Sequence, residues 1–174
     1  MLEGGDRRSI GESNAVVATV LSKPILFREL MQGMLHENPL VRMRSADAVE
    51  KVSAIHPEYL QPYRLRLFAL APAREQELRW HIAQMLPRLQ LTAAERRRAV
   101  NILLDYTHDQ SSIVRTCALQ ALADFALADA KLRKPVLAIL TGALKRGSPA
   151  MRARSRKLLG RFDDVRATRL ESQP

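Results

Sequence analysis

Side chains that could bind a metal or catalyse a reaction are sparse in this chain. The four histidines, His36, His56, His81 and His108, lack metal-ligand spacing with one another and with Cys117, the single cysteine. One cysteine excludes an internal disulfide. Cys117 has no basic neighbour and lies in an apolar stretch typical of a helix, which favours a structural thiol over a reactive nucleophile.

Paired carboxylates and phosphate loops give no stronger signal. Asp47 and Glu50 lie three residues apart on one predicted helix and would face water, where a carboxyl pKa is not raised. The seven glycines are dispersed and form no phosphate-binding loop. We therefore expect a non-catalytic protein with no metal, no cofactor and no small-molecule substrate.

The composition indicates one all-α domain outside the membrane. The chain has 174 residues, with 47% hydrophobic and only 5% aromatic side chains. No apolar run approaches the roughly 20 residues of a membrane span, and the first residues lack the apolar core of a secretory signal. These observations predict a cytoplasmic protein without membrane contact.

Positive charge is concentrated in the second half of the chain. The formal net charge is +10, of which residues 1–87 carry +1 and residues 88–174 carry +9. Such asymmetry favours an anionic partner, either a nucleic acid or an acidic protein surface. A solubilising surface is the alternative interpretation.

A repeat of about 37 residues organises the sequence. Four segments align without gaps, and each contains an apolar residue followed by an arginine. The four arginines are Arg42, Arg79, Arg115 and Arg152. Counted from each arginine, positions −1, +3, +6, +7 and +10 are apolar or small, which is one stripe of a 3.6-residue helix.

A second helix is predicted before each of these stripes. The four ranges are Ile25–Leu35, Pro57–Leu70, Thr92–Tyr106 and Asp129–Lys145. Asn38-Pro39 and Ser148-Pro149 are typical of an N-cap followed by proline, and Thr92 begins a capping box.

These elements predict the domain organisation. We expect a disordered segment at 1–13, a repeat domain at 14–162 that begins with a short helix near Asn14–Leu21, and a polar tail at 163–174. Stacked helix pairs would share one continuous core.

The repeated pattern resembles the HEAT repeat. The match is best from Val114 to Phe125, which reads Val-Arg-x-x-Ala-x-x-Ala-Leu-x-x-Phe, and it covers about residues 22–162. The resemblance implies an α-α superhelix, or solenoid, of about four helix pairs whose second helices line a concave binding face. The aspartate common before the Val-Arg pair of HEAT repeats is present only as Asp109, so a ladder of Asp–Arg pairs is not expected.

Rotation about the second helices predicts which residues face outward. The predicted partner-binding strip comprises Met43, Arg44, Asp47, Trp80, His81, Gln84, Thr116, Gln120, Arg154 and Lys157. Trp80 would be a binding hot spot, unless it packs across the groove onto the next repeat. The four repeated arginines would face the neighbouring repeat and have a structural role.

Three functions are compatible with this architecture. The leading hypothesis is a scaffold that binds a protein or peptide on its concave face. The alternative is nucleic-acid binding through the basic stretch from Lys145 to Arg161, with Arg96, Arg97 and Arg98 as a second cluster. A HEAT-like DNA glycosylase, which uses a basic groove with tryptophans and an aspartate, is a remote third hypothesis, because Trp80 has no aspartate on its own repeat.

Overall fold

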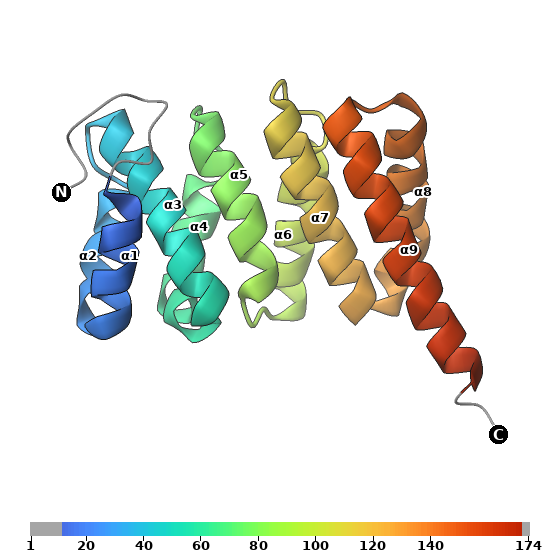
Figure 1. The fold of residues 1–174 in the computed structure, drawn as a ribbon, viewed down its shortest axis with the longest axis horizontal. Coiled ribbons are helices and arrows are strands. Elements are labelled where there is room, and N and C mark those ends of the chain that lie inside the picture. The colour runs from blue at the N-terminus through green and yellow to red at the C-terminus, as the bar shows by residue number, and fades with distance from the viewer. Residues whose placement is uncertain (1–11, 172–174) are drawn as a thin grey trace. The chain divides into compact units, whose positions relative to one another are not determined.

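The computed structural model describes residues 12–171, and side chains up to residue 165. Every regular element in this range is helical (Figure 1). The α-helices are α1 (Ser13–Ser22), α2 (Phe27–Gly33), α3 (Pro39–Ile55), α4 (Arg64–Leu70), α5 (Gln76–Met85), α6 (Ala93–Tyr106), α7 (Ser112–Ala128), α8 (Ala130–Arg146) and α9 (Pro149–Glu171). Three short 3₁₀ helices, η1 (Pro24–Leu26), η2 (Pro57–Tyr63) and η3 (Leu86–Arg88), join or extend them.

The chain forms two compact units, where the sequence suggested one repeat domain. Unit 1 is Met1–Glu95 and unit 2 is Arg96–Pro174. In unit 1, α3 packs against α1, α2 and α5. In unit 2, α7, α8 and α9 pack against one another.

Capping residues explain where several helices begin. The side chain of Asn38 accepts a hydrogen bond from the N–H of Leu40, and Ser148 Oγ accepts one from the N–H of Met151. The capping box before α6 is present, because Thr92 Oγ1 and the Glu95 carboxylate each accept the other residue's backbone N–H. All three predicted helix starts are confirmed.

The predicted apolar stripe forms the core of both units. Residues at positions −1, +3, +6, +7 and +10 from the repeated arginines are buried in all four segments, apart from the half-buried Leu159. The 3.6-residue period therefore identified the buried side of α3, α5, α7 and α9 correctly.

Small residues on the stripe allow close helix packing. Ser45 is fully buried against Gly33 at the end of α2. A Cβ atom placed on Gly33 would come within 2.2 Å of Ser45 Oγ, so glycine is required for this approach.

The predicted N-terminal and C-terminal boundaries of the repeat domain compare differently with the structure. Helix α9 continues to Glu171, so it extends into the polar tail that was predicted from residue 163. The predicted disordered segment falls almost wholly in residues 1–11, which lie outside the described residues. Ser13 already begins α1.

Candidate interaction surfaces

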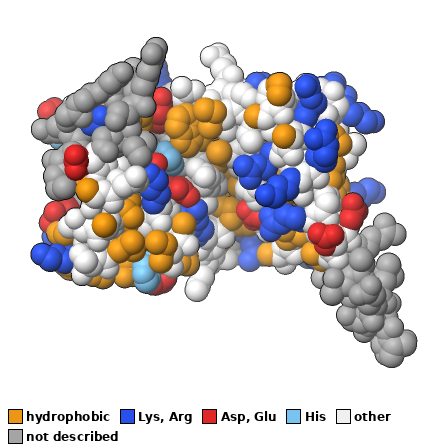
Figure 2. Space-filling model, viewed as in Figure 1, with side chains coloured by type: hydrophobic (Ala, Val, Ile, Leu, Met, Phe, Trp, Pro, Cys, Tyr) orange, Lys and Arg blue, Asp and Glu red, His pale blue; other side chains and the backbone are white. Residues whose placement is uncertain are grey.

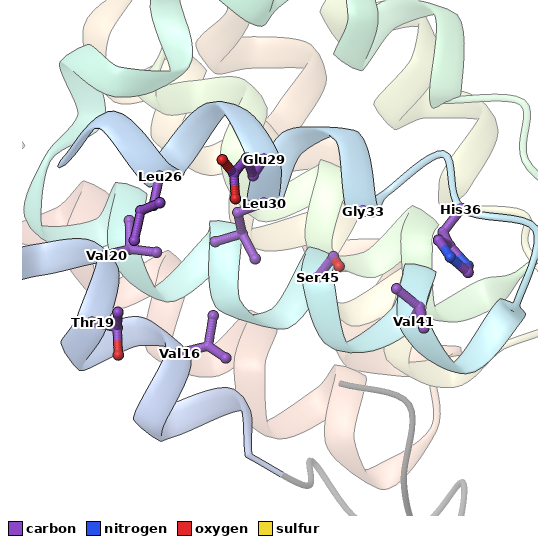
Figure 3. Close-up of a pocket in the computed structure, with 10 residues that line it drawn as sticks. All are labelled: Val16, Thr19, Val20, Leu26, Glu29, Leu30, Gly33, His36, Val41 and Ser45. Carbon is purple, nitrogen blue, oxygen red and sulfur yellow. The ribbon is translucent and has the colours of Figure 1, made fainter. Parts of the chain in front are cut away.

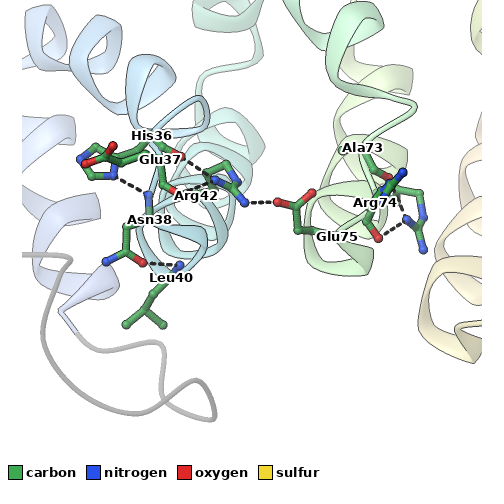
Figure 4. Close-up of polar contacts among 9 residues, drawn as sticks. His36, Glu37, Asn38, Leu40, Arg42, Ala73, Arg74 and Glu75 are labelled. Atoms are coloured by element: carbon green, nitrogen blue, oxygen red, sulfur yellow. Dashed lines mark hydrogen bonds and ion pairs between the residues drawn. The ribbon is translucent and has the colours of Figure 1, made fainter.

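The repeated arginines stabilise the loop that precedes their own helix. Arg42 Nη1 donates to the carbonyl oxygens of His36 and Glu37, at 2.7 and 2.8 Å (Figure 4). Arg79 Nη1 makes the same pair of bonds to Ala73 and Arg74, at 2.8 and 2.6 Å. These carbonyls lie in a turn with no helical partner, so the guanidinium satisfies acceptors that would otherwise need water.

The predicted contact between neighbouring repeats is present at the first of these arginines. Arg42 also pairs with Glu75, which lies in the loop before α5 (Figure 4). The backbone N–H of Glu75 and the Arg42 guanidinium both lower the pKa of this carboxyl. Arg152 repeats the loop contact through Gly147 O at 3.0 Å, whereas Arg115 Nε is buried without a partner among the described residues.

Two members of the predicted strip are buried, which corrects that part of the prediction. Arg44 is fully buried on α3, and His81 is only 7% exposed on α5. Both occupy position +2 of their repeats. The position of a residue around a helix predicts whether it faces the core. It does not predict whether a neighbouring helix covers the residues next to the core stripe.

His81 is held neutral by its surroundings. Burial lowers its pKa from 6.5 to about 4, although the carboxylates of Asp47 and Glu50 on α3 act in the opposite direction. Its Nδ1 atom is buried without a hydrogen-bond partner among the described residues. The Trp80 ring lies edge-on to it, with ring centroids 5.5 Å apart.

The remaining strip residues of unit 1 are partly exposed and engaged with the protein itself. Asp47 accepts hydrogen bonds from Ser13 Oγ on α1 and from Lys51 Nζ, the latter at 2.7 Å. Gln84 Nε2 donates to the carbonyl of Trp80. Met43 and Trp80 are half-buried, so neither is the fully exposed apolar side chain that the sequence predicted.

Polar links across the second helices follow the repeat period. In unit 1, Arg88 after α5 bonds the carboxylate and carbonyl of Glu50 on α3, and also Ser53 Oγ at 2.8 Å. In unit 2, Arg161 on α9 bonds Asp124 on α7 at 3.0 Å. The sequence analysis did not single out Glu50–Arg88 or Asp124–Arg161, yet their spacings of 38 and 37 residues match one repeat and could have revealed them.

A second link in unit 2 uses predicted strip residues. Arg154 Nη1 donates to Gln120 Oε1 at 2.8 Å, and Gln120 Nε2 donates to the carboxylate of Asp124 at 3.0 Å. Thr116 is turned onto its own helix, where Oγ1 donates to Ser112 O. The structure therefore brings Gln120 and Arg154 together, but leaves Thr116 in a local role.

Exposed basic side chains of α9 take part in these links or lie next to them. Arg154, Lys157 and Arg161 are all exposed and lie on one stripe, because they are spaced three and four residues apart. Figure 2 shows Lys and Arg side chains gathered over α7 and α9, with acidic side chains beside them. Residues 96–174 hold 16 Lys and Arg against 7 Asp and Glu, a net charge of +9.

Metal ligands and membrane-spanning helices are the other features considered. Among the side chains of residues 12–165, no group of three or more His, Cys, Asp or Glu is placed to hold a metal ion. No helix of this range is both long enough and apolar enough to cross a membrane.

Comparison with known proteins adds no family to this picture. No family model, no curated protein and no solved structure matches the chain. The function must therefore be inferred from the two units themselves.

Proposed function

We propose that the chain is a HEAT-like helical-repeat module whose second unit binds the phosphate backbone of a nucleic acid on the face formed by α7 and α9. The repeat assignment is supported by four helix pairs in one register and by the arginine that recurs in each second helix. A solenoid is the arrangement by which such pairs share their cores.

The observation that carries this function is the stripe of Arg154, Lys157 and Arg161 on α9. A Lys or Arg side chain gains affinity from a polyanion by displacing its condensed counterions. Arg154 and Arg161 are held by Gln120 and Asp124 through Nη1, so most of each guanidinium's five N–H groups remain for a phosphate. Lys157 lies between them with no bonded partner among the described residues.

The surroundings favour an anionic polymer over an acidic peptide of defined shape. The stripe is exposed and is not part of a closed pocket, which suits contacts to a repeating backbone. Asp124 bonds Arg161 of the stripe, and Asp163 and Asp164 follow it in the sequence. We expect binding with little sequence preference, because contacts to the phosphate backbone carry no sequence information.

The test compares two variants that remove the same charge from unit 2. Fluorescence anisotropy would follow labelled single-stranded DNA, duplex DNA and RNA with the parent, with R154Q/K157Q on α9 and with K131Q/K134Q on α8, where both lysines are exposed. For the α9 variant we expect weaker binding and a slope of log K against log salt that is smaller by about 1.5 to 2. The α8 variant should keep most of the affinity. Equal losses in the two variants, or no binding by the parent at low salt, would reject this face as the site.

Peptide binding on the second helices of unit 1 is a second candidate. It rests on Trp80, the only tryptophan in the sequence, which is half-buried, as is Met43. If Trp80 serves a partner, W80A should lower the free energy of unfolding by less than about 1 kcal/mol, because surface substitutions are mild. A loss of about 3 to 5 kcal/mol would show that Trp80 is a packing residue and would remove this candidate.

A further inference from the structure

A cavity of about 370 Å³ opens between α1 and α2 in unit 1, with α3 as its floor (Figure 3). Val16, Thr19 and Val20 line it from α1, and Leu30 faces them from α2. Ligand pockets commonly have volumes of roughly 300 to 1,000 Å³. The space is therefore large enough for a small molecule, although it is at the lower end of that range.

The walls of the cavity are aliphatic and fixed by the core. Val20 is 2% exposed, Leu30 is 6% exposed and Val41 is 7% exposed, so these side chains are held by packing on their far sides. Val16 and Leu26 are half-buried and complete an apolar surface without an aromatic ring. Such walls favour the body of an aliphatic ligand over a flat aromatic one.

Glu29 gives the cavity mouth a negative charge. Its side chain is exposed and is drawn on α2 beside Leu30 in Figure 3, and no ion pair holds it among the described residues. The neighbouring cations Lys23 and Arg28 do not line the cavity. A carboxylate beside an apolar space attracts a cationic group on a ligand that the space can hold.

Other polar atoms of the lining are hydrogen-bonded within the protein or inaccessible to a ligand. His36 Nδ1 accepts the N–H of Asn38 at 3.0 Å, and Thr19 Oγ1 donates to Ala15 O at 2.9 Å. Ser45 Oγ is buried beneath Gly33 and is not accessible to a ligand. Among the described residues that line the cavity, Glu29 is the carboxylate that can select a cationic head group.

We propose that this cavity binds a small aliphatic amine, with its hydrocarbon chain between α1 and α2 and its ammonium group against Glu29. The site lies in unit 1 and is independent of the nucleic-acid surface proposed for unit 2. An aliphatic carboxylate would meet the same walls, but it would be repelled by Glu29.

The experiment uses n-octylamine as the probe and the full chain labelled with ¹⁵N. Amide chemical shifts would be followed for n-octylamine, n-octanol and octanoate, which share the chain length and differ in head-group charge. We expect octylamine to shift amides of α1, α2 and α3, and octanol to bind about three- to fivefold more weakly, as for loss of one partly exposed ion pair. Octanoate should bind more weakly still.

Three variants distinguish the effect of the Glu29 charge on binding from the effect of the cavity space. E29Q should bind octylamine and octanol equally, whereas E37Q, which removes an exposed carboxylate outside the lining, should behave as the parent. T19W places a large side chain at the mouth from an exposed position and should block all three probes without disturbing the core. Octanoate binding as tightly as octylamine, full amine preference in E29Q, or shifts spread over both units would each overturn the proposal.

Discussion

Burial of His81 makes the stability of unit 1 depend on pH. The folded state holds the imidazole neutral with a pKa of about 4, whereas an unfolded chain protonates it near 6.5. Because the folded pKa is the lower one, acid favours the unfolded state. The contribution of neutral His81 is complete above pH 6.5 and is lost progressively as the pH falls toward 4.

The size of the effect follows from the two pKa values. Linkage gives a loss of about 2 kcal/mol at pH 5 and about 3 kcal/mol at pH 4 or below. Replacing His81 with leucine removes the titrating group. The substitution breaks no hydrogen bond at Nδ1, because that atom has no partner among the described residues of the parent. H81L should therefore lose about 2 kcal/mol less stability than the parent between pH 7.5 and pH 5.

Urea unfolding followed by the fluorescence of Trp80 measures this change. Trp80 is the only tryptophan and lies beside His81, so the signal reports on unit 1. H36N is the matched control, since it removes a half-buried imidazole of the same unit while His81 remains. The reasoning is refuted if H81L loses stability in parallel with the parent, or if H36N flattens the pH dependence as much as H81L does.

Three further predictions concern packing, polar links and capping, and each is measured by urea unfolding. G33A should destabilise unit 1 by roughly 1 to 3 kcal/mol, because the new Cβ would meet Ser45 Oγ, and adding S45G should recover part of the loss. R88A should lower the free energy of unfolding more than E50Q does, because Arg88 also bonds the Glu50 carbonyl and Ser53 Oγ. An equal or larger loss in E50Q would contradict the assigned bonds. N38A should cost about 1 kcal/mol through loss of the α3 N-cap, whereas N38D should retain most of the stability.

The helices and their buried sides could be predicted from the sequence because both depend on local rules. The 3.6-residue period identified the stripe that includes Val49, Ile82 and Leu122, and all three are buried. Caps such as Asn38 are read from single residues, so the starts of α3, α6 and α9 were also correct.

The lateral packing of neighbouring helices could not be predicted in the same way. Arg44 and His81 were placed on an outward flank, because rotation about one helix carries no information on what lies beside it. Helix α3 packs on α1 and on α5, so helices lie on both of its flanks. Position +2 is buried in α3 and α5, whereas on α9 it is the exposed Arg154.

Pairing of charges decides which of the basic residues can serve a partner. Arg42, Arg79 and Arg152 bond loop carbonyls beside their own helices, and Arg88 is held by Glu50 and Ser53. A phosphate that bound Arg42, Arg79 or Arg88 would compete with part-buried hydrogen bonds, and losing these costs roughly what the new contact returns.

The α9 stripe differs because its residues keep free donors. Arg154 and Arg161 each use Nη1 for a side-chain contact to α7, so their remaining N–H groups stay in solvent, and Lys157 has no bonded partner among the described residues. A ligand gains these contacts without unfolding a loop or exposing a buried acceptor. Arg42 and Arg79 therefore hold loops of unit 1, whereas Arg154, Lys157 and Arg161 keep side-chain donors in solvent.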